Sequence, residues 1–499
     1  MPVTTRLLMR RPALVSAVAL GVLADALLRA PGRPGLNVAL WALVGVVVLV
    51  MLLQYRPDAP SREALWFVGG ALAFAGDLVF RDAEALAVFS LFAAVVLLTL
   101  AAGRAASAWA ARAQVSDVAF SVMRVGLLCV AGPLGWGRGD PEAASSGSEW
   151  TRRGRTLARG TLMALPALLF LGALLMSADE VFARLVRDTF QVDIERLVQH
   201  LVVTAVFAWL TAGYARALVV RDDEIMDRLR VPQPALAAAE VSVALWILNL
   251  LFMAFMAVQL RYLFGGADLV EVTAGLTYAQ YARQGFFELV ATATLVLPIL
   301  LVADWAAAPS TDRSRIVLRG SAVVLVVLLV GVIASAAYRM RLYQDAYGLT
   351  EDRLYVSVFI VWLTAVLVWL VLTVLRGRRE RFAFGAIMAG LACIAGLYVL
   401  NPHALIAKVN IDRVAAGKPV DGAYLGGLSA DAVPVILARL DRLPEVERCR
   451  AARLLEERWS GERPGGWRTW NLSDSRARRL VVPLTVSATC PAVEVEPPK

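Results

Sequence analysis

The feature that most constrains this chain is a succession of long apolar segments separated by short loops that carry arginine. Each segment is roughly 17 to 25 residues long, and about 20 apolar residues in a helix cross the hydrocarbon core of a bilayer. With 59% hydrophobic and 18% charged residues, the chain has too little polar surface for a soluble globule. We therefore predict an all-α polytopic membrane protein whose first partner is the lipid bilayer.

Counting the apolar segments predicts about eleven transmembrane helices. The first follows Arg6, Arg10 and Arg11 and resembles a signal peptide, but no convincing small-residue cleavage site follows, so we predict a retained helix. A weaker amphipathic segment at 115–130 holds Arg124 within an apolar pattern and is expected along the membrane interface. The predicted spans are residues 13–28, 36–53, 64–80, 84–102, 157–176, 201–220, 238–260, 285–305, 316–337, 356–375 and 382–400.

The order of these segments divides the chain into four regions. Residues 1–103 hold the N-terminal transmembrane helices, and residues 104–156 hold the amphipathic segment and a flexible cytoplasmic loop rich in Gly, Ser and charge. Residues 157–400 hold the central transmembrane helices. Residues 401–499 form a polar tail, predicted to be a small, mostly helical extracytoplasmic domain.

The distribution of arginine predicts the orientation. With the N-terminus inside, the loops on the inner side carry 21 arginines and those on the outer side, excluding the tail, carry 11. We therefore predict a cytoplasmic N-terminus and an outer, extracytoplasmic C-terminal tail, although one span more or fewer would reverse the side of the tail. The net charge of +9 follows this topology and gives no reason to expect a nucleic-acid partner.

Local signals in the tail predict several elements. Asn401 and Pro402 are typical of a helix start, Asp431 is predicted to cap the next helix, and residues 444–459 to form another. The run from Leu480 to Val486 is rich in β-formers and predicts one strand or an extended arm.

The four cysteines fall into two groups. Cys129 and Cys393 lie in apolar surroundings and are expected to be small core residues. Cys449 and Cys490 both lie in the polar tail, where an oxidising compartment would favour a disulfide worth about 4 kcal/mol by the chain-entropy model; two unpaired thiols are the alternative. The cysteines and the two histidines, His200 and His403, have no metal-ligand spacing, so neither a metal site nor a cofactor is predicted.

Five stretches carry a resemblance to a known family. Two come from the predicted membrane region, YARQGFFEL at Tyr281 and YRMRLYQDAYGLT at Tyr338; three come from the tail, NPHALIAKVNIDR at Asn401, AYLGGLSADAVPVIL at Ala423 and WRTWNLSDSRARR at Trp467. Together they resemble the bacterial membrane family called domain of unknown function 4173 (DUF4173), over roughly the second half of the chain. The resemblance implies a multi-pass bacterial membrane protein with a tail of this kind and adds no activity.

The polar bridge 338–355 gives the candidate binding site. Charged groups inside apolar helices are costly and often functional, and Glu288 is expected a few residues below the outer surface, within reach of this bridge. We hypothesise that Glu288 pairs with one arginine of the bridge while another binds an anionic lipid headgroup. The predicted pocket comprises Arg339, Arg341, Glu288, Arg283, Tyr281, Tyr343 and Tyr347. The alternative is an aromatic belt with snorkelling arginines, and Asp25, Asp77 and Asp304 are expected to be ordinary charges near helix ends.

The sequence leaves the biochemical activity open. It holds no nucleophile elbow, Walker loop, zinc signature or internal duplication, but a membrane transferase can use a single acid and an arginine cluster. The first expectation is a membrane platform or regulator whose outer tail binds a protein partner, with Trp467 and Trp470 as candidate contacts. The alternative is that these tryptophans form the tail's own core or rest on the bilayer. The alternative function is a transporter or a lipid- or envelope-handling enzyme that uses the outer-face pocket.

Overall fold

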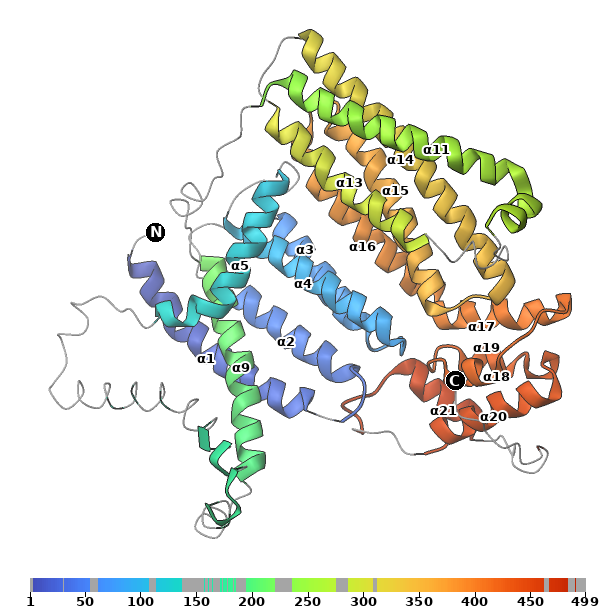
Figure 1. Cartoon of the computed structure of the whole chain (residues 1–499). Helices are drawn as coiled ribbons and strands as arrows, with labels where there is room; N and C mark the ends of the chain where they lie inside the picture. The colour runs from blue at the N-terminus through green and yellow to red at the C-terminus, as the bar shows by residue number, and fades with distance from the viewer. Residues whose placement is uncertain are drawn as a thin grey trace.

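The fold is helical throughout the part of the chain that the computed structural model describes, and no strand occurs there (Figure 1). The structure describes residues 3–29, 31–53, 62–106, 114–136, 194–219, 236–274, 286–307, 312–461, 466–482 and 490, together with scattered positions between 157 and 184. The predicted span at 157–176 lies mostly outside these residues.

The helices form three groups along the chain. The first comprises α1 (Val3–Leu28), α2 (Leu36–Leu53), α3 (Arg62–Asp77), α4 (Glu84–Ala106), α5 (Val115–Trp136) and α9 (Ile194–Val219). The second comprises α11 (Ala238–Ala274), α13 (Phe286–Ala306), α14 (Asp312–Tyr347), α15 (Glu351–Thr373), the 3₁₀ turn η2 (Arg379–Arg381) and α16 (Phe382–Leu400). The third, which we call the C-terminal helices, comprises α17 (Pro402–Asp412), η3 (Arg413–Ala416), α18 (Gly422–Gly427), α19 (Val433–Leu437), η4 (Leu440–Arg442), α20 (Glu445–Trp459) and α21 (Leu472–Val481).

Ten of the described helices are long and apolar enough to cross a membrane. Nine of them correspond to predicted spans, and the tenth is α5. Side chains on these helices are apolar and exposed, as Val95, Ile247, Val327 and Val361 are, each more than half exposed. A surface of this kind is stable against lipid and not against water, so the protein is embedded in the bilayer.

Helix α3, predicted as a span, is too short to be counted among the ten, whereas helix α5, predicted to lie along the interface, is long enough. At 16 residues, α3 is shorter than the predicted segment 64–80, because the chain turns at 78–80 to meet the C-terminal helices. Helix α5 packs closely on α9: the Trp209 indole N–H donates to the Val130 carbonyl at 2.7 Å, and a Cβ on Gly213 would lie 2.5 Å from the Cys129 carbonyl oxygen. Its length and composition fit a span, while its interfacial placement stays a prediction.

Helix α16 joins the two groups of membrane helices. Its Phe382 belongs to the core formed by α11, α13, α14 and α15, where Leu325, Leu367 and Leu370 are fully buried. Its Leu391 belongs to the core that α2, α3, α4, α5 and α9 share. The last membrane helix therefore holds both groups together.

The C-terminal helices have a core that continues into the membrane helices. Ile406, Leu425 and Leu455 are fully buried in it. Leu349, from the turn before α15, and Leu354, from the first turn of α15, belong to the same cluster. In Figure 1 these helices lie across the ends of α14, α15 and α16. We call this side of the protein the junction face and the opposite side the far face.

The cap at Asn401 and the helix at 444–459 are confirmed. Asn401 adopts φ 52° and its side chain accepts a hydrogen bond from the Ala404 amide, and α20 begins directly after Pro444. The strand or extended arm expected from Leu480 to Val486 is wrong at its start, because Leu480 and Val481 belong to α21. Residues 483–486 lie outside the described residues. Helix α21 is capped by Asn471 and buries Ala477 and Val481, four residues apart on one face.

Candidate functional site

The described residues form two polar sites at opposite ends of the membrane helices. One is the junction, where the C-terminal helices meet the loops before α2, before α4 and before α15. The other is a cavity on the far face that carries three arginines. The junction consists largely of hydrogen bonds between side chains and backbone groups, whereas the polar groups of the cavity are charged side chains.

Two buried aspartates form the centre of the junction. The Asp431 carboxylate accepts hydrogen bonds from the amides of Asp82 and Ala83, at 2.9 and 3.0 Å, and the Asp82 carboxylate accepts one from the Ala430 amide at 3.1 Å. Their side chains are 1% and 7% exposed. Asp431 was predicted to cap α19, but that helix has Ala432 at its N-cap and no side-chain cap; the carboxylate instead satisfies amides of the loop before α4.

Cations surround these aspartates. The Arg33 guanidinium lies 2.9 Å from the Asp82 carboxylate, and the Arg81 guanidinium lies 3.8 Å from that of Asp431 and over the Tyr398 ring. Burial raises the pKa of Asp82 to about 6, although Arg33 and the Ala430 amide act in the opposite direction, and Asp431 and Asp474 raise it further. For Asp82, burial therefore outweighs the compensation that Arg33 and the Ala430 amide provide.

The start of α21 completes this part of the junction. The Asn471 amide donates to the carbonyls of Leu78 and Arg81, at 2.8 and 2.6 Å, and the Ser473 hydroxyl donates to the Phe80 carbonyl at 2.8 Å. The loop before α2 joins from the other side, where the Leu36 amide donates to the Trp470 carbonyl at 3.0 Å. Nearly all of these hydrogen bonds satisfy a backbone carbonyl or amide of a loop, which would otherwise need water as its hydrogen-bond partner.

A second part of the junction lies where α14 turns into α15. The Asn410 side chain both accepts from the Leu349 amide and donates to its carbonyl, at 2.8 and 2.7 Å. His403 accepts from the Ser429 amide through Nδ1 at 2.9 Å, and its Nε2 lies 3.3 Å from the Glu351 carboxylate. The hydrogen-bond pattern assigns the proton to Nε2, which faces the acid. The part of the polar bridge from Asp345 to Glu351 thus contacts the C-terminal helices, whereas Tyr338 and Tyr347 remain exposed.

Five of the seven residues of the predicted outer-face pocket lie in the part of the chain that the structure describes. Buried Arg339 donates to the Gln259 side chain at 2.8 Å, whereas Arg341 and Glu288 are exposed. Glu288 lies in the first turn of α13. Tyr343 and Tyr347 do pack edge to face, with the Arg353 guanidinium 4.0 Å from the Tyr343 ring centroid. Tyr281 and Arg283 lie outside the described residues.

The remaining sequence-predicted residues have clear positions. Cys449 and Cys490 form a disulfide that ties α20 to the chain after α21. Asp25 on α1 lies 2.5 Å from the His200 imidazole of α9 and 3.4 Å from the Arg29 guanidinium, so it links two helices. Asp304 belongs to the far-face cavity.

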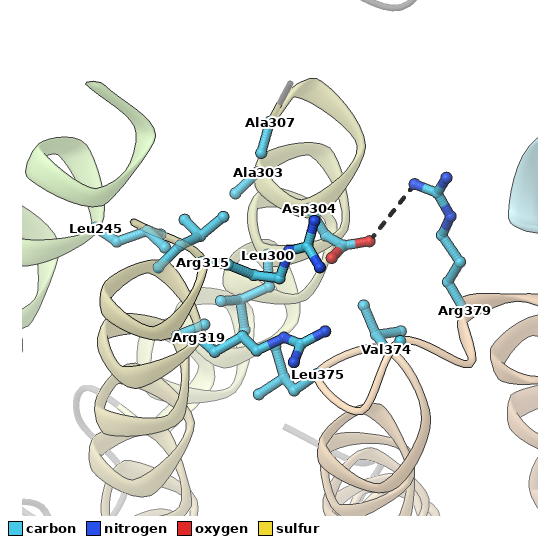
Figure 2. A pocket seen from close by; sticks show the side chains of 13 residues that line it. Leu245, Leu300, Ala303, Asp304, Ala307, Arg315, Arg319, Val374, Leu375 and Arg379 are labelled. Atoms are coloured by element: carbon cyan, nitrogen blue, oxygen red, sulfur yellow. Dashed lines mark ion pairs between the residues drawn. The ribbon is translucent and has the colours of Figure 1, made fainter. Parts of the chain in front are cut away.

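We call this second site the basic cavity (Figure 2). It has a volume of about 320 Å³ and lies where the end of α13, the start of α14 and the end of α15 meet. Arg315 and Arg319 reach into it from α14, and Arg379 reaches in from η2, 4.0 Å from the Asp304 carboxylate. Leu245, Leu300, Leu318, Val374 and Leu375 contribute apolar walls.

Neither site was predicted from the sequence. For the basic cavity a signal exists, since Arg315 and Arg319 are four residues apart and therefore share a helix face, on the same predicted side as Arg379. For the junction no local signal identifies Asp82 and Asp431 as partners, because each resembles an ordinary turn or cap residue.

A family model for a domain of unknown function (DUF4153) matches residues 64–438. The chain belongs to this family. The resemblance to DUF4173 is therefore wrong, since the match is to a different domain of unknown function. The DUF4153 match includes both junction aspartates and the whole basic cavity, and it ends before α20 and the disulfide. No curated protein and no solved structure matches the chain.

Proposed function

We propose that this DUF4153 protein is a platform or regulator in the bacterial cytoplasmic membrane, and that its C-terminal helices bind a protein partner on the outer side. The observation that carries the proposal is the junction. It fastens the C-terminal helices to the loops before α2 and α4 and to the turn between α14 and α15, through Asn37, Asp82 and Leu349 among others. A partner that displaces the C-terminal helices would therefore act on both groups of membrane helices.

The proposed orientation has two supports. The sequence count of 21 arginines in the loops predicted inside and 11 in those predicted outside assigns the ends of α13 and α15 and the start of α14, on the far face, to the cytoplasmic side. The Cys449–Cys490 disulfide lies on the junction face, and disulfides persist in oxidising compartments. Both observations favour a cytoplasmic far face and an extracytoplasmic position for the C-terminal helices.

The proposed partner surface includes Trp467. Its side chain is 60% exposed, with the Arg468 guanidinium 6.0 Å from the ring centroid. The neighbouring backbone is fixed, because the Trp470 amide donates to the Trp467 carbonyl and the Arg468 carbonyl accepts from Asn37. An exposed tryptophan on a fixed backbone loses little conformational entropy on binding. Trp470 is only partly exposed and contributes mainly to the junction.

The alternative, a transporter or lipid-handling enzyme that uses the outer-face pocket, has less support. Arg339 already donates to Gln259, and Arg353, rather than Arg341, stacks on Tyr343. The geometry therefore favours a structural role for much of the predicted pocket.

The platform proposal is tested in cells that lack the native copy and show an envelope or growth defect. We expect the wild-type chain to restore growth, and both a chain ending at Leu400 and a Trp467→Ala variant to fail while reaching the membrane in normal amounts. Trp66→Ala is the matched control, because Trp66 is exposed on α3 and should face lipid. Full activity of the truncated chain would refute the platform proposal and favour activity in the membrane helices.

Orientation is tested separately with a membrane-impermeant maleimide on intact cells. After reduction by an impermeant phosphine, Cys449 and Cys490 should become labelled from outside, and a Cys449→Ser/Cys490→Ser variant should not. Labelling only after the membrane is permeabilised would place the junction face in the cytoplasm.

A further inference from the structure

The basic cavity lies at headgroup depth on the far face. Helix α14 has an uncharged stretch from 320 to 338 between Arg319 and Arg339. At about 1.5 Å per residue this stretch spans about 28 Å, close to the thickness of the hydrocarbon core. Arg319 therefore marks one boundary of the hydrocarbon, and Arg315 lies about one turn farther out.

The cavity carries more positive charge than its own carboxylate can neutralise. Three guanidinium groups line it, and among its lining residues Asp304 is the single acid. Asp304 lies 4.0 Å from Arg379 and interacts electrostatically with Arg319. No carboxylate of the described residues lies within 4 Å of the Arg315 or Arg319 guanidinium. The excess is two positive charges, and two of the guanidiniums sit one turn apart on one helix face, where like charges repel.

The backbone turn after α15 borders the cavity next to Arg319. Gly377 has φ 76°, and a Cβ there would lie 3.4 Å from Nη2 of Arg319. The turn is fixed by hydrogen bonds from the Arg378 amide to the Thr373 carbonyl and from the Gly377 amide to the Val374 carbonyl, at 2.8 and 2.9 Å. A sharp glycine turn thus brings backbone close to the Arg319 guanidinium without a side chain to fill the space.

We propose that the basic cavity binds a phosphate group, which Arg315 and Arg319 hold through charge-assisted hydrogen bonds while Arg379 stays paired with Asp304. Guanidinium groups match phosphate oxygens in geometry and charge. A volume of about 320 Å³ is small for a ligand pocket and suits a phosphorylated headgroup or a small phosphorylated molecule. The leucine walls beside the arginines would accommodate the apolar part of such a ligand. This site is independent of the platform proposal, because it lies at the other end of the membrane helices.

The test uses the full-length protein purified in an uncharged detergent, with thermal unfolding followed by tryptophan fluorescence. One arm adds inorganic phosphate at constant ionic strength, and the other adds phosphatidylglycerol to the micelles, with phosphatidylcholine as the lipid control. We expect at least one probe to stabilise the wild type. Arg315→Gln/Arg319→Gln should weaken that binding by about tenfold or more.

Matched variants separate the cavity from the general positive charge of the far face. Arg313→Gln/Arg376→Gln removes the same charge from the same side but from outside the cavity lining, and it should bind like the wild type. Asp304→Asn frees Arg379 and should bind at least as tightly. If the double variant fails to fold, Arg315→Gln alone serves, because Arg315 is exposed.

The two arms identify the source of the phosphate group. Stabilisation by phosphate indicates a soluble ligand, and stabilisation by phosphatidylglycerol alone indicates a lipid headgroup. Equal losses in the cavity variant and in the control variant would overturn the proposal, as would no response of the wild type to either probe or abolished binding in Asp304→Asn.

Discussion

Asp82 and Asp431 each accept a hydrogen bond from the backbone of the other's loop, across 349 positions of sequence. Asp431 satisfies the amides of Asp82 and Ala83, and Asp82 satisfies that of Ala430. This reciprocal arrangement joins the turn between α3 and α4 to the segment before α19. It explains why neither carboxylate is exposed although neither lies in an apolar core.

Replacing Asp431 by alanine should loosen the junction. The change leaves two buried amides without an acceptor, and each such loss costs about 1–3 kcal/mol. Hydrogen exchange of a peptide containing residues 78–83 should accelerate. Asp421→Ala is the control, since Asp421 is exposed and caps α18 through the amides of Ala423 and Tyr424. Equal acceleration in both variants would show that Asp431 has no special role at the junction.

The stability of the junction should depend on pH through Asp82. Its pKa is raised from 3.8 to about 6, chiefly by burial, so the folded state binds the proton more tightly than the unfolded state does. The free energy of unfolding should therefore fall as pH rises from about 4 to about 6, by about 3 kcal/mol from this group.

Thermal unfolding across this pH range checks the Asp82 prediction. Asp82→Asn should flatten the dependence, and Arg33→Gln should extend it to higher pH, because Arg33 opposes the rise in the pKa of Asp82. Asp441→Asn, at an exposed position, should leave the profile unchanged. A wild-type profile retained by Asp82→Asn would assign the dependence to another group.

Two substitutions of His403 should differ in cost. The side-chain oxygen of asparagine would lie near the position of Nδ1 and can still accept from the Ser429 amide. The side-chain amide group of glutamine would lie near the position of Nε2, so the buried Ser429 amide would lose its acceptor. We expect His403→Gln to cost about 1–3 kcal/mol more than His403→Asn. The lost contact with Glu351 should matter less, since that side chain is 37% exposed. Equal melting temperatures for the two variants would argue against the assigned tautomer.

Two glycines with positive φ should respond differently to alanine. Gly417 has φ 70° and open space around its Cβ position. Alanine there should lower the free energy of unfolding only by the cost of a left-handed backbone conformation, about 1–2 kcal/mol. Gly348 has φ 83°, and its Cβ would meet the Asn410 side-chain oxygen at 2.6 Å. Gly348→Ala should lower the melting temperature clearly more than Gly417→Ala, because Asn410 must shift and lose its bonds to Leu349. A smaller effect at Gly348 would mean that this part of the junction is loosely packed.

The sequence was most informative where one local signal decides the structure. Apolar length predicts the membrane helices because each must satisfy its own backbone in lipid, and Asn401 and Pro402 predict the start of α17 because an N-cap and an N1 proline act within one turn. Leu480 and Val481 were expected to begin a strand or an extended arm but lie in α21, because the cap at Asn471 and the burial of Val481 outweigh their β-rich composition. Composition alone does not decide the placement of helix α5, since it fits both a span and an interfacial helix.

The sequence by itself determined that this chain is a helical membrane protein, where most of its membrane helices lie and which loops carry excess positive charge, because hydropathy and charge act over a few helical turns. Only the tertiary structure decided which distant groups meet. Asp431 has the appearance of a helix cap until the loop at Asp82 is placed beside it, and Arg315 becomes part of a cavity only when Asp304 and Arg379 arrive from other helices. Hydrogen bonds and ion pairs act over a few ångströms, so their partners are fixed by helix packing and not by position along the chain.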